Sequence, residues 1–166
     1  MIKGLNLPDS PRTAVFILLA EVIRNDPLIR SVCKETSLRF LDGDPREKNE
    51  LGLDQAPAMR FTVSTGPDEW WQPESFKGPL VINVEMLVKG FNQLDVQNLW
   101  WALVRAIYPK DQATKLAIQK RLVSAGAETG QCRFTQPAYD PQQLPASGGF
   151  HAMGQITLMI RLPLNT

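Results

Sequence analysis

The chain has 166 residues, of which 18 are Lys or Arg and 17 are Asp or Glu, and its formal net charge is +1. This balance of basic and acidic residues argues against a protein that binds the phosphates of nucleic acid, so sequence-specific DNA recognition is not expected. A chain of this length most simply forms one domain, residues 1–166, which buries about two-thirds of its unfolded surface without disulfides or metals.

The cysteine content and the hydropathy of the sequence further limit the class of protein. The two cysteines, Cys33 and Cys132, are too few for a disulfide framework and fit no zinc spacing, which suits a reducing compartment. We interpret both as small core or boundary residues. The longest apolar run, residues 14–20, is far too short to cross a membrane, and no signal-peptide n-region precedes it. The sequence therefore predicts a soluble protein without a visible export signal.

The N-terminal region predicts an arm, two helical segments and a strand. Residues 1–10 form the expected arm, because the first eight show no hydrophobic periodicity. A helix is expected over 11–25, since Asp9-Ser10-Pro11 supplies capping residues and a proline at the first helical position. One more helical turn over 28–34 and a short strand over 37–41 follow.

Two strands with alternating apolar and polar residues are expected in the middle of the chain. The first covers 57–65 and the second, which we take as the centre of the sheet, covers 78–89. Each presents one apolar side and one polar side, which indicates that one face of the sheet is buried. The apolar positions are Met59, Phe61 and Val63 in the first strand, and Leu80, Ile82, Val84, Met86 and Val88 in the second.

A helix over 95–108 is expected next, with Asp95 as its N-cap. Trp101, Val104 and Tyr108 form a second apolar stripe beside its main apolar face, so the helix is apolar over more than the roughly 100° that a core-facing helix needs. Either the core covers this helix on two sides, or another chain does. The main apolar face consists of Val96, Leu99, Trp100, Leu103 and Ile107.

The C-terminal region predicts a further helix that Asp111 caps and that ends near Gly126, then strands over 131–135 and 152–164. Clean alternation on the strands favours an antiparallel sheet over a buried parallel one. We therefore expect an α+β fold: an antiparallel or mixed β-sheet of four or five strands, with two or three helices packed on one face.

The sequence predicts no catalytic, cofactor-binding or metal-binding residue. This absence of motifs does not exclude an enzyme, but it favours a binding or assembly role, so we do not expect an enzyme. The single histidine, His151, follows Gly148-Gly149 at an expected loop end without a second ligand at metal spacing, so we interpret it as a bystander. No phosphate-binding, dinucleotide-binding, zinc-protease or hydrolase motif occurs. If the domain binds a small molecule, the place to expect it is His151 with Tyr139 beside that glycine turn.

Three long loops, about 42–56, 66–78 and 136–150, carry an unusual number of large apolar side chains. These side chains either close the ends of their own core or contact neighbouring subunits, where aromatic residues are enriched. The second stripe on the 95–108 helix favours subunit contacts. The expected interface residues are Trp70, Trp71, Phe76, Trp101, Tyr108, Tyr139 and Phe150.

The order of the predicted segments along the chain resembles that of a known protein family. It includes SLRFLDGDP leading into a loop, the strands APAMRFTVSTG and PLVINVEMLVKG, the helix DVQNLWWALVRAIYP and the last strand GQITLMIRLPL. Over residues 11–163 this order resembles the tail terminator proteins of long-tailed bacteriophages, small ring proteins that close the tail tube. The chain departs from shorter members by the extended loops GPDEWWQPESFKG and QPAYDPQQLPASGG.

The resemblance implies a non-enzymatic virion protein at the head-proximal end of the tail, assembled in the bacterial host cytoplasm. It implies a homo-hexameric ring between the tail tube protein and a head-closure or connector protein, with DNA passing through the lumen without sequence-specific binding and no membrane contact. The polar sheet face would line the lumen or, as we favour, meet solvent or an axial partner. That face carries Arg60, Glu85, Lys89, Arg133 and Arg161.

Two other functions remain open from the sequence. Another neck, tail-completion or adaptor protein of a phage or phage-like machine would share the same ring architecture. A small-molecule-binding or enzymatic α+β domain would instead need a pocket and would act as a monomer or dimer.

Overall fold

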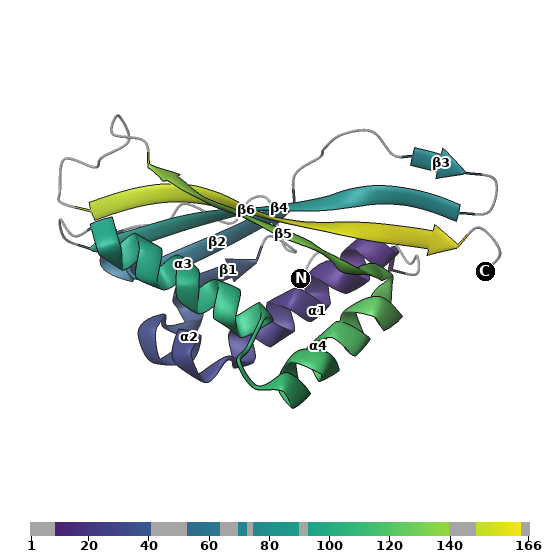
Figure 1. Ribbon diagram of the computed structural model, residues 1–166. Helices are drawn as coiled ribbons and strands as arrows, with labels where there is room; N and C mark the ends of the chain where they lie inside the picture. The colour runs from purple at the N-terminus through teal and green to yellow at the C-terminus, as the bar shows by residue number, and fades with distance from the viewer. Residues whose placement is uncertain are drawn as a thin grey trace.

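The computed structural model describes residues 9–40, 53–63, 70–72, 75–89, 93–139 and 149–163. Over these residues the chain forms an α+β fold with four α-helices packed on one face of a mixed six-stranded sheet, which confirms the expected fold class (Figure 1). The helices are α1 (Pro11–Asn25), α2 (Pro27–Val32), α3 (Gln93–Ile107) and α4 (Gln112–Ala125). The strands are β1 (Leu38–Phe40), β2 (Ala58–Val63), β3 (Trp70–Gln72), β4 (Ser75–Lys89), β5 (Ala127–Tyr139) and β6 (Gly149–Pro163).

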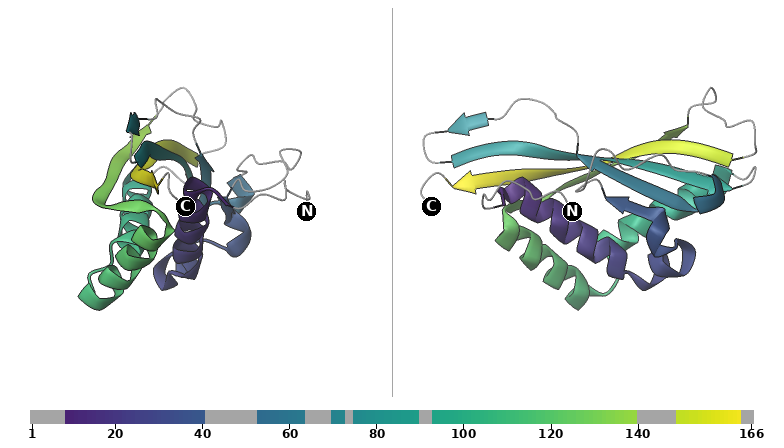
Figure 2. Two further views of the ribbon diagram at one scale, coloured as in Figure 1. Left: turned by 90° about the vertical axis from the view of Figure 1, so that its right-hand side faces the viewer. Right: turned by 180° about the vertical axis from the view of Figure 1, so that it is seen from behind.

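The sheet has the order β1-β2-β4-β6-β5, and β3 pairs with the start of β4. β1 runs parallel to β2, whereas every other pairing is antiparallel. β4 and β6 pair along their whole length, from Ser75 opposite Pro163 to Lys89 opposite Gly149. The views in Figure 2 show that all four helices lie on the same side of this twisted sheet. The molecule therefore has one helix-covered sheet face and one polar sheet face.

The core lies between the sheet and the helices, as the alternation along β4 predicts. Its five alternating apolar residues, Leu80 to Val88, are all at most 4% exposed. Met59 and Phe61 of β2 are buried as well, whereas Val63 at the end of that strand is 44% exposed. Phe40 stacks on Phe61 with ring centroids 4.5 Å apart, which joins β1 to this core. The predicted inward face of the sheet is confirmed except at Val63.

Side chains cap three helix starts, and the sequence indicates two of these caps, Ser10 and Asp111. The Ser10 hydroxyl accepts a hydrogen bond from the Thr13 amide at 3.2 Å, and the Asp111 carboxylate accepts one from the Thr114 amide at 2.9 Å. The Asp26 carboxylate does the same for α2. Each cap satisfies an amide that has no partner within its helix. α4 ends at Gly126, whose φ of 119° is the left-handed conformation that glycine favours.

Several expected boundaries are wrong. Asp95 is not an N-cap, because α3 begins at Gln93 and places Asp95 in its first turn. In that position the negative charge of its carboxylate is stabilised by the positive end of the helix dipole. β5 runs over Ala127–Tyr139, far beyond the strand expected over 131–135. The expected loop over 66–78 contains β3 and the start of β4, which pair as a hairpin with Trp71 opposite Phe76. β5 and the start of β4 are extended by pairing with β6, which is distant in sequence, and local periodicity does not record that pairing.

The other expected loops are described only in part. Residues 1–8 of the expected arm, residues 42–52 of the first loop and residues 140–148 of the third lie outside the described residues. The end of the first loop forms a short 3-10 helix, Leu53–Gln55. The Ser37 hydroxyl donates to the Gln55 carbonyl at 2.7 Å, which ties this segment to the start of β1.

Candidate subunit interface

The outward face of α3 exposes two large apolar side chains. Leu94 is 66% exposed and Trp101 is 59% exposed. They are seven residues apart, so they lie two turns from each other on the same face of the helix. The opposite face, which includes Leu99 and Leu103, is buried against the sheet. α3 therefore supplies both core and exposed apolar surface.

The second apolar stripe of this helix is divided between the core and solvent. Val104 and Tyr108 are half-buried and pack against the core of the same chain. The Tyr108 ring meets the Phe134 ring edge-on, with centroids 5.7 Å apart, and burial raises the pKa of the Tyr108 hydroxyl. Tyr108 is thus largely covered by its own chain, and of the expected stripe only Trp101 stays mainly in water.

Trp101 has one charged neighbour on its own helix. The guanidinium carbon of Arg105 lies 5.5 Å from the centroid of the Trp101 ring. A cation over an aromatic ring contributes about 0.5–1 kcal/mol at an exposed site. This contact restricts the ring on the helix surface, which lowers the entropy that a partner would have to remove on binding.

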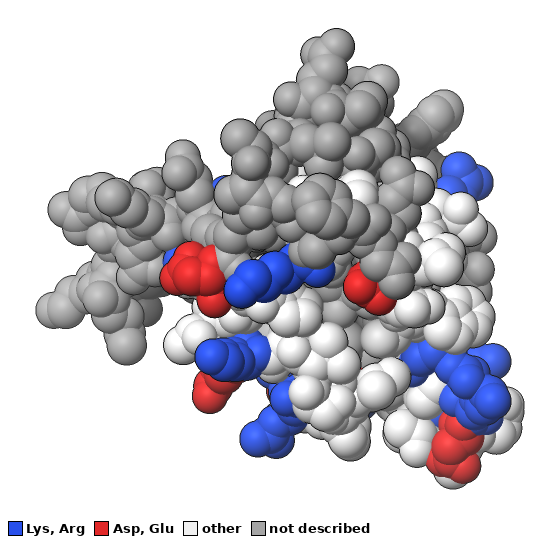
Figure 3. Space-filling view, turned by 90° about the vertical axis from the view of Figure 1, so that its left-hand side faces the viewer, with Lys and Arg blue, Asp and Glu red and all other residues white. Residues whose placement is uncertain are grey.

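An apolar groove lies beside this exposed face, between α2, α3 and the end of β4. Leu28 and Val32 of α2 form one wall and are 53% and 43% exposed. Val88, Leu99 and Ala102 form the buried base of the groove. Its volume is about 610 Å³. Figure 3 views the molecule from this end, where an uncharged area of the described surface is bordered by charged side chains of both signs. We call this feature the α2–α3 groove.

The structure describes the other expected interface residues to different extents. Phe150 is 7% exposed and belongs to the core, so the expectation that it contacts a partner is corrected. It lies in β6 with its side chain on the helix-covered face, where it helps to close the end of the core. Trp70, Trp71, Phe76 and Tyr139 have their backbones in β3, β4 and β5, and their side chains lie outside the described residues. Their interface role stays a prediction.

Sequence reasoning missed Leu28, Val32 and Leu94. Leu94 precedes Asp95, so the expected helix start excluded it from the helix. Leu28 and Val32 sit in a helix of only six residues, α2, which is too short to show an apolar face by periodicity. The signal that was available is the spacing from Leu94 to Trp101, which becomes visible once α3 is extended to Gln93.

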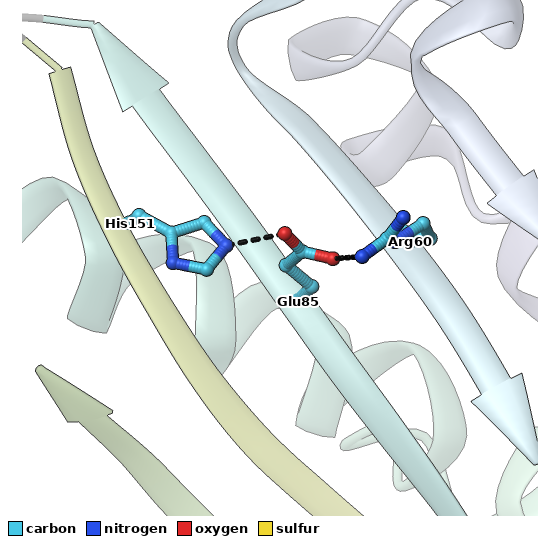
Figure 4. A network of polar contacts seen from close by, with 3 residues as sticks. All are labelled: Arg60, Glu85 and His151. Carbon is cyan, nitrogen blue, oxygen red and sulfur yellow. Dashed lines mark hydrogen bonds and ion pairs between the residues drawn. The ribbon is translucent and has the colours of Figure 1, made fainter. Parts of the chain in front are cut away.

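On the polar sheet face, three partly buried charged or titratable side chains from adjacent strands form a cluster (Figure 4). Glu85 of β4 contacts Arg60 of β2 with one carboxylate oxygen and the Nε2 atom of His151 of β6 with the other. The register of the strands explains why these three side chains lie close together. Arg60 lies directly opposite Glu85, and His151 lies opposite Leu87, one diagonal position away. His151 therefore lies within a strand and not at a loop end, which corrects the expected position, and it has a partner.

The electrostatics of this cluster favour an ionised Glu85. Burial raises the pKa of the Glu85 carboxyl, but the hydrogen bond from His151 and the positive charge of Arg60 outweigh it, so the net pKa is lowered. Its side chain is 15% exposed, close to the 16% of His151. A carboxylate held between two donors on rigid strands stabilises the sheet, and its lowered pKa makes it a poor general acid or base near neutral pH.

The other charged residues of the polar face are partnered or exposed. Glu128 accepts from Lys77 and from Arg161, each at 2.9 Å, and the hydrogen bond from Lys77 is the main cause of the lowered pKa of Glu128. Lys89 and Arg133 are exposed. This face therefore carries ion pairs in which Arg60, Lys77 and Arg161 meet two carboxylates, together with the exposed cations Lys89 and Arg133.

The two cysteines lie where the sequence predicts, Cys33 in the core and Cys132 half-buried. Burial raises the pKa of the Cys33 thiol to about 11 and that of the Cys132 thiol to about 12. Both are therefore neutral thiols near pH 7, and neither has the thiolate character that nucleophilic catalysis requires.

The nominated small-molecule site is described only in part. Backbone pairing sets Tyr139 opposite Ala152, next to His151, while Gly148 and the Tyr139 side chain lie outside the described residues. Among the described residues, no group of three or more His, Cys, Asp or Glu side chains is arranged to hold a metal ion.

Within the described ranges, none of the helices has both the length and the apolar character that a membrane span requires. Neither a protein-family model nor a curated protein matches this sequence. We therefore infer function from the fold, from the exposed face of α3 and from the α2–α3 groove.

Proposed function

We propose that this protein is a tail terminator: a structural virion protein whose copies form a hexameric ring on the end of a phage tail tube. The ring stops further tube subunits from adding and provides the surface on which a head-closure or connector protein docks. The observation that carries the proposal is the exposed apolar surface at one end of the helix layer. It consists of Leu28, Val32, Leu94 and Trp101.

The energetics of this surface favour association. Fully burying a large apolar side chain contributes about 1.5–3 kcal/mol. The four side chains are 43–66% exposed, so covering each contributes a part of that amount and offsets some of the cost of association. Aromatic residues are enriched in interfaces, and Trp101 is the largest of the four. A ring closes by heterologous contacts, in which one face of each subunit meets a different face of the next. Leu94 and Trp101 are the two most exposed of the large apolar side chains that the structure describes, which makes the face of α3 that carries them suited to such a contact.

The polar sheet face suits solvent or an axial partner. Besides the Arg60–Glu85–His151 cluster, Gln155 donates to Asn83 across β4 and β6 at 3.0 Å. Arg60, Lys77 and Arg161 each meet a carboxylate of the same chain, which reduces their attraction for phosphates. In the proposed ring, DNA passes through the lumen without sequence-specific contacts, and the mechanism is steric and non-enzymatic.

The test measures assembly and tube length together. Native mass spectrometry should detect six copies per particle, and adding the protein to polymerising tail tube protein should shorten the tubes seen by electron microscopy. Trp101→Ser should weaken both effects, because it removes the exposed ring. The matched control is Val123→Ser on α4, since Val123 is 43% exposed and lies away from this surface. A wild-type chain that stays monomeric and leaves tube length unchanged contradicts the proposal.

The same ring architecture would serve another neck or adaptor protein, and partner choice separates the two functions. A terminator binds the ends of tubes in the absence of heads, whereas a neck protein binds the connector first. Negative-stain images of the protein mixed with tubes alone, and with connector rings alone, distinguish them.

A further inference from the structure

The α2–α3 groove has the size and lining of a binding site for an apolar segment. Its volume of about 610 Å³ falls within the range of about 300–1,000 Å³ that is typical of ligand pockets. Its base is apolar, and the exposed Leu28 and Val32 form a wall that a bound side chain would cover. Asp95 and Lys89 at its border supply an acceptor and a donor that can bond to a peptide main chain.

The chain contains a segment of matching chemistry just before α1. Residues 1–8, MIKGLNLP, include Ile2, Leu5 and Leu7, and Lys3 is their one charged residue. In an extended chain Leu5 and Leu7 point to the same side, and Pro8 favours an extended Leu7. Such a segment can place two leucines into a groove while its main chain bonds to groups at the border.

The segment joins the described chain just before α1, at the end of α1 that is farther from the groove of the same chain. Pro11 at the start of α1 lies beside Gly126 at the end of α4, since a Cβ added to Gly126 would be 2.8 Å from that of Pro11. The groove begins at Leu28, just beyond the other end of α1, as the positions of α1, α2 and α3 in Figure 1 show. A helix of 15 residues is about 22 Å long, at about 1.5 Å per residue.

That separation disfavours binding within one chain. Eight extended residues span at most about 27 Å, at about 3.4 Å each. Nearly all of the segment would be used to run back along α1, and little would remain to fill the groove. A neighbouring copy placed head to tail brings the start of its α1 to the groove instead, so the whole segment is available.

We propose that residues 1–8 of one copy occupy the α2–α3 groove of the next copy. This inference rests on the proposed ring, for which it supplies the two different complementary surfaces that a heterologous contact requires. Each copy donates one segment and accepts one, so a closed ring leaves no groove empty. The segment covers Leu28 and Val32, and it extends toward the exposed Trp101.

The direct test is a photo-crosslink within the full chain. Leu5 is replaced by benzoylphenylalanine, equal amounts of ¹⁴N-labelled and ¹⁵N-labelled protein are mixed before assembly, and crosslinked peptides are identified by mass spectrometry. We expect crosslinks from residue 5 to peptides that contain Leu28–Val32 or Leu94–Ala102, with many pairs joining a light to a heavy chain. Crosslinks to other surfaces, or pairs of a single isotope only, overturn the inference.

Variants test the same contact by assembly. Deleting residues 1–8, or introducing Leu28→Asp, should raise the protein concentration required for assembly at least about 10-fold, which corresponds to 1.4 kcal/mol. Ile17→Asp is the matched control, because Ile17 is 45% exposed on α1 and does not line the groove. Circular dichroism verifies that each variant is folded. Unchanged assembly of the deletion variant overturns the inference.

The two proposals fail in different ways. If the wild-type chain forms rings and shortens tubes while the deletion variant does so equally well, the segment exchange is wrong and the terminator function stands. If the crosslinks join different chains through the groove while tube length is unaffected, the exchange stands and the terminator function is wrong.

Discussion

Trp100 and Trp101 are neighbours in the sequence, but α3 places them in opposite environments. Trp100 is 4% exposed, meets the Phe134 ring edge-on at 6.3 Å and packs over Gly154 of β6. Trp101 is 59% exposed and has Arg105 over its ring. A turn of about 100° per residue separates their side chains, so one supports the fold and the other is available to a partner. The same residue type thus has two roles that only its position relative to the sheet distinguishes.

The largest expected effect is that of Trp100→Ala. Removing a buried ring that packs on the sheet should lower the free energy of unfolding by about 3–5 kcal/mol. Urea unfolding at a protein concentration below assembly measures it. A loss below about 1 kcal/mol would contradict the core role of Trp100 and with it the contrast between the two tryptophans.

A smaller effect is expected from Gly154→Ala, which tests the sheet surface beneath Trp100. The added Cβ would lie 2.8 Å from an edge carbon of the Trp100 ring and 3.0 Å from the Thr135 carbonyl oxygen. Such overpacking should cost about 1–3 kcal/mol in the same unfolding assay. Combining it with Trp100→Leu should make the Gly154→Ala penalty smaller, because the shorter side chain vacates the space. Strictly additive losses would show that the ring is not what the new methyl group meets.

The contrast between buried and exposed groups extends to charges, and Glu85→Gln tests it. Glu85 is 15% exposed between two donors, whereas Glu21 is 51% exposed in its 2.9 Å ion pair with Arg121. At pH 7, Glu85→Gln should cost about 1–2 kcal/mol, and Glu21→Gln less than about 1 kcal/mol. Chemical unfolding of both variants beside the wild type measures the difference. Equal losses would contradict the special role of the strand cluster.

The lowered pKa of Glu85 also sets a direction for pH dependence. A carboxyl whose pKa is lowered on folding stabilises the protein above its unfolded pKa of about 4.3, and this stability is lost as pH falls through the lower folded value. Wild-type stability should therefore fall below about pH 4.3 more steeply than that of Glu85→Gln. Thermal unfolding from neutral pH down through the unfolded pKa of about 4.3 measures both slopes. Parallel slopes would show that Glu85 is not held as an ion in the folded protein.

The smallest effect on folding is expected from Trp101→Ser. Because this ring is mainly exposed and contacts Arg105, its loss should cost less than about 1 kcal/mol in the unassembled chain. The same substitution should weaken assembly, so comparing urea unfolding with native mass spectrometry separates the two effects. A loss as large as that of Trp100→Ala would place Trp101 in the core and remove it from the interface.

Periodicity and capping signals predicted most of the fold. Helix α1 follows from the Ser10 cap, the buried side of β4 follows from its alternation, and the end of α4 follows from Gly126. Strand β3, in an expected loop, and the full length of β5 were not predicted, because both depend on pairing with other strands. Local sequence records which side of a strand is apolar, but it does not record how far a neighbouring strand continues.

The candidate interface was predicted less completely than the fold. The sequence indicated the apolar stripe with Trp101, but it also included Phe150, which the sheet buries. It omitted Leu28 and Val32, because only the packing of α2 beside α3 makes them one wall of a groove. An apolar residue looks the same in a sequence whether its own chain or another chain covers it.

The sequence by itself determined the main helices and the apolar side of the central strand β4, since capping and periodicity depend on neighbours along the chain. Only the tertiary structure decided which apolar side chains remain exposed, and that Arg60, Glu85 and His151 meet across three strands. The physical reason is that burial and ion pairing depend on distances between segments far apart in sequence. Those distances are set when the helices pack on the sheet and β6 pairs with β4 along its full length.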